Sequence, residues 1–434
     1  MSFPRHQRYK DSGVEWLGEV PEHWSVERLG RSFLHIREKV SDKDFPPLSV
    51  TKNGVVPQLA NAAKTDDGDN RKLVRAGDFV INGRSDRNGS AGLADRDGSV
   101  SLINLVLRPV SMYGNFVHHL LRSLPFQQEF YRMGKGIVAD LWSTGYGEMS
   151  DIILAVPPFS EQRMIAEFLD HETGKVDKLI EEQRRLIELL KEKRHAVISH
   201  AVTKGIDSSA SLRDSGVEWL GMVPEHWQMC PVRYHYRVEL GRMLDEKRAF
   251  GAAMGRYLRN VDVQWNRINV TDLPEMDFPP QERQRFLVRQ GDLLVCEGGD
   301  LGRSALVQHD IEDLFYQKAL LRLRPLKTDR DCGKFMLYQL WNANLQQRFV
   351  AAQNKATIGH LPAETLRAYV FLFPSLNEQV EITTYLDSFT NKLDALSDQA
   401  CQAVQILQER RSALISAAVT GKMEVRNYRP EEAA

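Results

Sequence analysis

Arginine, asparagine and lysine side chains gather in a few glycine-rich segments of this sequence. The segment 82–88 reads NGRSDRN, and the second half of the chain carries YLRN at 257–260, an Arg-Ser pair at 303–304 and NKATIGH at 354–360. Arginine and asparagine donate paired hydrogen bonds to guanine and adenine edges, and lysine binds phosphate. For each of these residues a phosphate contact or plain surface exposure also explains its presence. The candidate nucleic-acid contacts are Lys52, Asn82, Arg84, Arg87, Asn88, Lys135, Arg256, Arg259, Asn260, Arg303, Lys355, Thr357 and His360.

Catalytic motifs are missing from the sequence. No phosphate-binding G-x-x-x-x-G-K-[ST] loop, dinucleotide G-x-G-x-x-G loop, zinc-protease H-E-x-x-H motif or G-x-S-x-G motif occurs. The segment VPPF at 156–159 resembles the motif of amino-methylating enzymes but lacks the polar residue before the first proline, so we interpret it as a turn. The twelve histidines do not cluster at ligand spacing. We therefore expect no catalytic residue, no metal ion and no cofactor in this chain.

A long internal repeat organises the chain. Residues 11–24 read DSGVEWLGEVPEHW, and residues 214–227 repeat them with one difference, Glu19 against Met222. A second match begins at Glu161 and at Glu378 and continues to RHAVISHAVTKG (194–205) and RSALISAAVTGK (411–422). The Glu-His pair in each tag could form a duplicated catalytic dyad, but packing around the tag tryptophans explains it better. A period of about 200 residues indicates two duplicated halves rather than a solenoid.

The repeat divides the chain into six segments. We predict a first tag (1–24), a first variable block (25–156), a long helix with its linker (157–213), a second tag (214–227), a second variable block (228–373) and a second long helix with its tail (374–434). The variable blocks share only one short similar segment, RAGD at 75–78 against RQGD at 289–292. Strand-like runs at 102–109 and 319–325, with helical patterns at 116–133 and 333–351, predict an α+β fold for each block.

The two long helical segments carry apolar residues at spacings of three and four over about five heptads, which is typical of a coiled-coil seam. Since a lone helix would expose this seam, we expect the two helices to pair with each other, antiparallel. The alternatives are that each helix docks on its own block or on another subunit. The predicted seam residues are Val176, Leu179, Leu186, Leu190, Val197, Ile382, Leu386, Phe389, Leu393, Leu396, Leu407 and Leu414.

The charge of the chain is balanced but unevenly distributed. The chain has 434 residues with 57 Lys and Arg against 58 Asp and Glu, which argues against binding nucleic acid by bulk charge alone but leaves binding by localised patches open. The blocks 25–156 and 228–373 carry net charges of +2 and +4, and the remaining segments sum to −7. The four cysteines are dispersed and no 18-residue apolar stretch occurs, so we expect a soluble protein of the reducing cytoplasm.

The doubled tag, the PPFSEQ (157–162) and SLNEQ (375–379) turns, and the helices ending in AVTKG and AVTGK resemble the specificity subunit of type I restriction–modification systems. The resemblance covers essentially the whole chain. It implies two α/β target recognition domains joined by an antiparallel coiled coil with pseudo-twofold symmetry. It also implies that each domain reads one half of a bipartite double-stranded DNA target while the helices set the spacer.

The resemblance further implies partners that hold the chemistry. Two modification subunits would bind S-adenosylmethionine and methylate adenine N6, and restriction subunits would use ATP and Mg²⁺ to translocate and cut DNA. One alternative is a non-catalytic coiled-coil scaffold with two peptide-binding domains. Two others, part of a single-chain restriction–methylation enzyme and an RNA-binding enzyme, conflict with the missing cofactor motifs.

Overall fold

The computed structural model describes residues 4–60, 68–136, 142–243, 251–351 and 359–429. The predicted contacts Lys355 and Thr357 lie outside the described residues. The chain forms two compact units, the first made of 1–184 with 401–434 and the second of 185–400. Among the described residues, no helix has both the length and the apolar character needed to cross a membrane.

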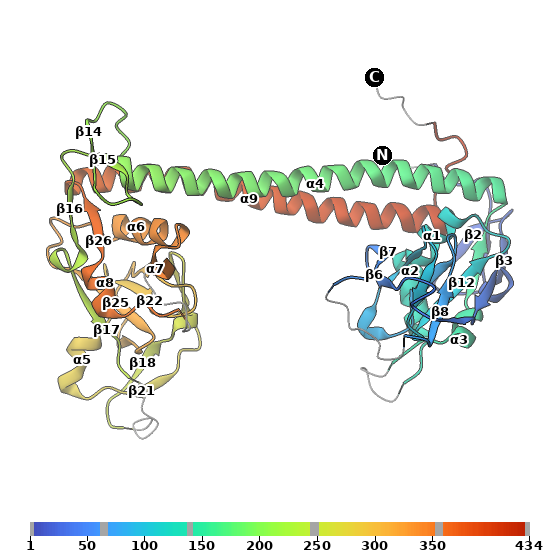
Figure 1. The fold of residues 1–434 in the computed structure, drawn as a ribbon, viewed down its shortest axis with the longest axis horizontal. Coiled ribbons are helices and arrows are strands. Elements are labelled where there is room, and N and C mark those ends of the chain that lie inside the picture. The colour runs from blue at the N-terminus through green and yellow to red at the C-terminus, as the bar shows by residue number, and fades with distance from the viewer. Residues whose placement is uncertain (1–3, 61–67, 137–141, 244–250, 352–358, 430–434) are drawn as a thin grey trace. The chain divides into compact units, whose positions relative to one another are not determined.

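The first unit contains thirteen strands and three complete helices in its described part (Figure 1). The strands are β1 (Tyr9–Asp11), β2 (Glu19–Pro21), β3 (Ser25–Arg28), β4 (Phe33–Ile36), β5 (Lys39–Val40), β6 (Leu48–Thr51), β7 (Gly54–Pro57), β8 (Arg71–Val74), β9 (Phe79–Asn82), β10 (Ala91–Leu93), β11 (Gly98–Val100), β12 (Asn104–Pro109) and β13 (Ile153–Val156). The helices are α1 (Gly114–Arg122), α2 (Leu124–Arg132) and α3 (Tyr146–Ser150).

The second unit also has thirteen described strands. They are β14 (Leu212–Asp214), β15 (Met222–Pro224), β16 (Gln228–Pro231), β17 (Tyr236–Leu240), β18 (Met254–Leu258), β19 (Val263–Gln264), β20 (Arg267–Ile268), β21 (Glu275–Asp277), β22 (Leu293–Cys296), β23 (Ser304–Leu306), β24 (Leu314–Tyr316), β25 (Leu320–Pro325) and β26 (Val370–Phe373). Its helices are α5 (Pro280–Phe286), α6 (Gly333–Leu345), α7 (Arg348–Ala351) and α8 (Ala363–Ala368). The predicted mixture of helices and strands is therefore confirmed in both units.

The two units share one sheet topology. The central antiparallel sheet has the order β10-β9-β12-β4 in the first unit and β23-β22-β25-β17 in the second. The similar segments RAGD and RQGD lie just before β9 and β22, and the aspartate of each segment has the same role in its unit. The Asp78 carboxylate accepts two hydrogen bonds from Arg108 on β12, and the Asp292 carboxylate accepts two from Arg324 on β25. This shared ion pair confirms that the diverged blocks are copies of one fold.

The helices predicted at 116–133 and 333–351 are each broken, which corrects the sequence analysis. Pro125 cannot continue α1, and the Ser123 hydroxyl accepts a hydrogen bond from the Phe126 N–H to begin α2. In the second unit α6 ends at Leu345, and Gln347 takes a positive φ of 55° before α7.

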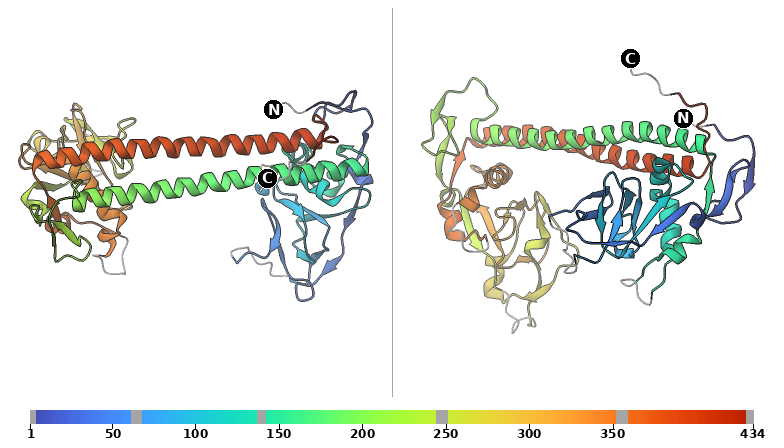
Figure 2. Two further views of the ribbon diagram at one scale, coloured as in Figure 1. Left: turned by 90° about the horizontal axis from the view of Figure 1, so that it is seen from above. Right: turned by 45° about the vertical axis from the view of Figure 1, so that its right-hand side comes forward.

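The long helices are α4 (Phe159–Lys204) and α9 (Leu376–Val419), and Figures 1 and 2 show them side by side. In the first unit Leu169 of α4 shares a core with Leu414 of α9, and in the second unit Ile198 of α4 shares a core with Ile382 of α9. The beginning of each helix therefore lies against the end of the other. Antiparallel pairing, as predicted, is confirmed within each unit.

Part of the predicted seam is wrong. Leu179, Leu186 and Leu396 are exposed by 46%, 41% and 48%. A strict seven-residue repeat was extended through the helices, but an undistorted helix advances 3.6 residues per turn, so its inner face drifts by one position. Ile180 is buried on the inner face in place of Leu179, while Ala400, four residues after Leu396 in the same predicted apolar pattern, is buried as expected. Of the other predicted seam residues, Val176, Ile382, Leu386, Leu393 and Leu414 are buried, and Leu190, Val197, Phe389 and Leu407 are partly buried.

Each tag packs against both long helices of its unit. Trp24 and Trp227 are each 1% exposed. Trp24 shares a core with the start of α4 and the end of α9, while Trp227 packs against the end of α4 and the start of α9. The packing interpretation of the tags is therefore confirmed, because each tag holds the two helix ends together.

Candidate nucleic-acid interface

A pocket opens in the first unit where β9 ends. After β9, the Gly83 carbonyl accepts a hydrogen bond from the Thr144 N–H at 2.9 Å, and Arg84 pairs with Ser143. The pocket has a volume of about 450 Å³. Its walls are Gly83, Arg84, Leu102, Ile103, Leu105 and residues 142–145. A side chain at Gly83 would place Cβ 2.6 Å from the Thr144 oxygen, so this close approach of two backbones requires glycine.

The second unit has a pocket in the corresponding place. After β22, the Glu297 carbonyl accepts a hydrogen bond from the Leu361 N–H at 2.7 Å, and Gly298 pairs with His360. This pocket has a volume of about 430 Å³ and is lined by Met243, Asn260, Glu297, Gly298, Gln317, Lys318, Ala319 and His360. The same main-chain pairing thus closes a pocket at the end of the same strand in both units, while the side chains that line it differ.

In the first unit, the predicted contact Arg84 lines the pocket, and the predicted contacts Lys135 and Asn82 are bonded to residues of its lining. Arg84 is exposed on the wall, where its guanidinium lies 3.2 Å from Asp86. Lys135 pairs with Ser143 through the backbone and extends its exposed ammonium group to Glu148 at 2.9 Å. Asn82 is 6% exposed and its side-chain oxygen accepts a hydrogen bond from the Arg84 N–H, so it shapes the loop.

Other predicted residues of the first unit lie outside this pocket lining. Arg87 is exposed in the short 3-10 turn that follows Arg84. Asn88 is exposed in a separate pocket beside Arg122. Lys52 is exposed, and its backbone oxygen accepts a hydrogen bond from Arg122. Exposure leaves these three side chains accessible to DNA. Their assignment as DNA contacts stays a prediction.

In the second unit, the predicted contacts Asn260 and His360 line the pocket, and Arg303 is bonded to Asn260 behind this lining. The Asn260 amide donates to the Gly298 carbonyl at 3.1 Å, and Arg303 donates to the Asn260 side-chain oxygen at 2.8 Å. Asn260 and Arg303 therefore hold the pocket wall in place with these bonds. The His360 imidazole is exposed and lies 3.1 Å from the Glu297 carboxylate.

The two remaining arginines of the second unit do not line its pocket. The Arg259 guanidinium donates two hydrogen bonds to Asp262, at 2.8 and 2.9 Å. Arg256 is exposed on β18 and donates to the Glu312 carbonyl. Both guanidinium groups thus bond to acceptors within the unit, one three residues away and the other 56 residues away in the sequence.

Glu297 is a pocket residue that sequence reasoning missed. Its side chain is 7% exposed, and burial raises the pKa of its carboxyl group, opposed by the positive charges of His360 and Lys318. A carboxylate can accept a hydrogen bond from the cytosine amino group, which arginine and lysine cannot do. The available signal was its position, directly after an apolar strand and before Gly298-Gly299.

Known proteins resemble this chain in sequence. Residues 264–404 match the family described as the type I restriction modification DNA specificity domain. The chain is 22% identical over 329 residues to the type I restriction enzyme EcoKI specificity subunit of Escherichia coli K12, covering 73% of this chain and 68% of that protein. It is also 22% identical over 295 residues to the EcoBI specificity subunit of Escherichia coli, covering 63% and 59%.

Solved structures share the fold. One, described under "Structural basis underlying complex assembly and conformational transition of the type I R-M system", matches with a TM-score of 0.72 at 15% identity, covering 92% of this chain and 98% of that chain. The HsdS subunit from Thermoanaerobacter tengcongensis matches with a TM-score of 0.55 at 17% identity, covering 93% and 98%.

Proposed function

Because the chain belongs to the family of type I restriction–modification specificity subunits, we propose that it recognises a bipartite DNA sequence for a multisubunit complex. Each variable block, 25–156 and 228–373, reads one half of the target. The observation that carries this proposal is the duplicated pocket: one backbone arrangement is repeated in both units with different lining side chains. Two copies of one reader with different side chains suit an asymmetric target.

The chemistry belongs to partner subunits in this proposal. Two modification subunits bind S-adenosylmethionine and methylate adenine N6, and restriction subunits use ATP and Mg²⁺ to translocate and cleave DNA. Adenine inside a duplex must be extruded before its amino group can react, so the specificity subunit holds the DNA on both sides of that base. The complex acts in the cytoplasm, where the genome lies.

Mapping N6-methyladenine in genomic DNA by long-read sequencing tests the proposal. The chain is produced with its modification subunits in a host that lacks other adenine methylation. We expect methylated adenines within one bipartite sequence. Methylation without a bipartite sequence would contradict the proposal, and failure of the purified complex to bind duplex DNA at low salt would favour the peptide-binding scaffold instead.

The Arg84→Ala variant tests the pocket of the first unit. A bidentate hydrogen bond from arginine to a base edge is worth about 1–3 kcal/mol, so we expect a roughly 5- to 150-fold loss of affinity with relaxed selectivity in one half-site only. The matched control is Arg28→Ala, which removes an exposed arginine of the same unit that does not line the pocket and pairs with Asp151. Equal weakening on every sequence, with a smaller salt dependence, would instead assign Arg84 to a phosphate.

The paired helices set the distance between the half-sites in this proposal. Inserting one or two heptad-preserving turns within 186–193 of α4, with compensating residues within 403–410 of α9, lengthens both helices together. We expect the spacer of the methylated sequence to lengthen. An unchanged spacer in a folded variant would refute this part of the proposal.

A further inference from the structure

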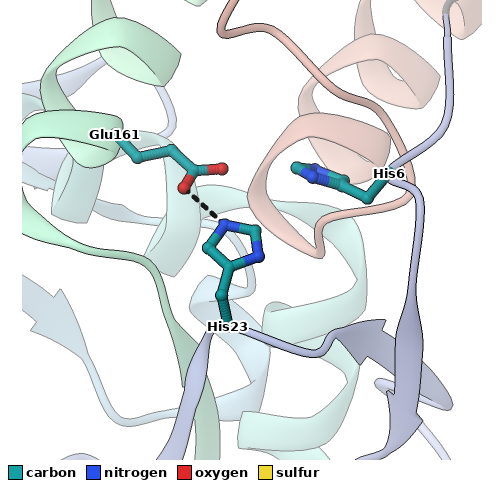
Figure 3. A group of neighbouring side chains, drawn as sticks. All are labelled: His6, His23 and Glu161. Carbon is teal, nitrogen blue, oxygen red and sulfur yellow. Dashed lines mark hydrogen bonds and ion pairs between the residues drawn. The ribbon is translucent and has the colours of Figure 1, made fainter.

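Three side chains from separate segments of the first unit face one another in Figure 3. His6 precedes β1, His23 lies between β2 and β3, and Glu161 lies in the first turn of α4. One ligand atom from each can be chosen so that all three atoms lie within 4.8 Å of one another. The sequence analysis expected no metal ion because the histidines are dispersed along the chain, yet folding brings these two together with a carboxylate.

His6 is the unexplained member of this group. It is 6% exposed, and neither ring nitrogen has a hydrogen-bond partner among the described residues. Its ring lies among the rings of Tyr9, His23 and Trp24, with centroids 5.5 to 6.1 Å away. A buried polar group without a partner costs free energy, so a missing ligand for His6 is a physical explanation of its position.

Glu161 is already oriented as a metal-binding carboxylate would be. Its Oε1 atom accepts a hydrogen bond from the Trp24 indole N–H at 3.1 Å, and its Oε2 atom lies 2.8 Å from Nε2 of His23. The indole fixes the carboxylate, and the second oxygen is directed towards His23. The His23 side chain is 38% exposed, which lets water reach the group as a fourth ligand.

The second half of the chain supplies an internal comparison. There Glu378 accepts from the Trp227 indole at 2.8 Å and lies 3.0 Å from Nε2 of His226. The residue that corresponds to His6 at the tag offset of 203 is Ser209, which is exposed. The Glu-His-Trp arrangement therefore belongs to the fold, and the third, buried histidine is particular to the first half.

We propose that His6, His23 and Glu161 bind one Zn²⁺ ion, with water in the fourth position. Two imidazole nitrogens and a carboxylate oxygen are ligands that zinc accepts in tetrahedral geometry. In that geometry the ligand atoms lie about 3.3 Å apart, so the ion draws the His6 ring inwards and replaces the 2.8 Å hydrogen bond between His23 and Glu161 by a slightly wider spacing. The ion joins the segment before β1, the tag and the first turn of α4.

Two features of the surroundings agree with this site. Burial lowers the pKa of His6, and the neutral imidazole is the form that binds a metal. The nearby charges of the tail balance each other, because Arg426 forms an ion pair with Glu424 at 2.6 Å.

Metal titration of the full chain tests the proposal. The protein is stripped with a chelator and titrated with Zn²⁺ by calorimetry, and separately with Co²⁺ by absorption spectroscopy. We expect one equivalent of metal to bind per chain. The Co²⁺ complex should show visible absorption bands typical of nitrogen and oxygen ligands and no thiolate charge-transfer band. His6→Ala should weaken zinc binding at least tenfold, whereas His226→Ala, the matched control in the second tag, should leave it unchanged.

A second measurement separates zinc binding from packing. In hydrogen exchange, Zn²⁺ should slow exchange in residues 4–24 and leave 214–227 unchanged. His6→Phe keeps an aromatic ring but no nitrogen, and its exchange should not respond to zinc. No zinc binding by the folded wild type, binding unaffected by His6→Ala, or a thiolate band in the cobalt spectrum would each overturn the proposal.

Discussion

Removing the Asp292 carboxylate should destabilise the second unit selectively. The side chain is 1% exposed and accepts three hydrogen bonds, one from the Arg289 N–H at 2.8 Å and two from Arg324, each at 2.6 Å. Asp292→Ala leaves the Arg324 guanidinium without its counter-ion. Breaking a buried ion pair costs about 3–5 kcal/mol. Because Arg324 is 25% exposed and retains a bond to the Leu287 carbonyl, we expect about 3 kcal/mol.

Hydrogen exchange of the intact protein measures this loss in one unit at a time. A decrease of about 3 kcal/mol accelerates exchange of the protected amides of β22 and β25 roughly 150-fold, while β9 and β12 keep their rates. Asp292→Asn keeps the shape and one acceptor oxygen, so its effect should be about 1.5 kcal/mol, or roughly tenfold.

The equivalent variant in the first unit is the matched control. Asp78→Ala should accelerate exchange of β9 and β12 and leave β22 and β25 unchanged, with a smaller effect because Arg108 is 43% exposed and regains water. An acceleration below about threefold in Asp292→Ala would refute the buried-pair reasoning. If either variant accelerated amide exchange equally in both units, the two units would not unfold independently, which would refute this part of the prediction.

Three further outcomes are expected from chemical unfolding or hydrogen exchange. Leu386→Ala, at a fully buried position, should destabilise the second unit by about 2–5 kcal/mol, whereas Leu396→Ala, at a position 48% exposed, should change stability by less than about 0.5 kcal/mol; equal effects would restore the strict heptad seam. Gly421→Ala should cost more than Gly205→Ala, because both glycines have φ above +70° but only at Gly421 would Cβ approach Pro21, at 2.3 Å; equal costs would contradict the packing at Pro21. Burial and the Arg122 charge lower the pKa of His118 to about 3, so the unfolded chain takes up a proton below pH 6.5 that the folded chain excludes, and stability falls as the pH drops. Between pH 7 and 5 this loss is up to about 2 kcal/mol, and His118→Gln should remove it; an unchanged pH profile would contradict the assignment.

The repeated elements could be predicted from the sequence because their signals are local. The tags are nearly identical over fourteen residues, and the apolar pattern of α4 and α9 extends over more than forty residues. The register error at Leu179 is a displacement of one residue, a rotation of 100° about the helix axis, because Ile180 is the buried neighbour. Tertiary packing decided between them.

The candidate site was predicted only in part, because its pockets depend on contacts between distant residues. Gly83 and Thr144 are 61 positions apart, and their pairing leaves no motif in the intervening sequence. Residue type predicted Asn82 and Asn260 as DNA contacts, which stays a prediction, but it did not indicate that Asn82 accepts a hydrogen bond from the Arg84 N–H or that Asn260 donates one to the Gly298 carbonyl. Glu297 was overlooked for the same reason, since its importance comes from burial beside His360.

The closure of both pockets by main-chain hydrogen bonds has a consequence for the evolvability of the protein. The bonds from Thr144 N–H to Gly83 and from Leu361 N–H to Glu297 use no side-chain atoms, although the first also requires glycine at 83. Lining positions such as Ile103, Met243 and Lys318 can therefore mutate while this closure is kept. Selection for a new ligand preference can thus change these side chains with little loss of folding stability.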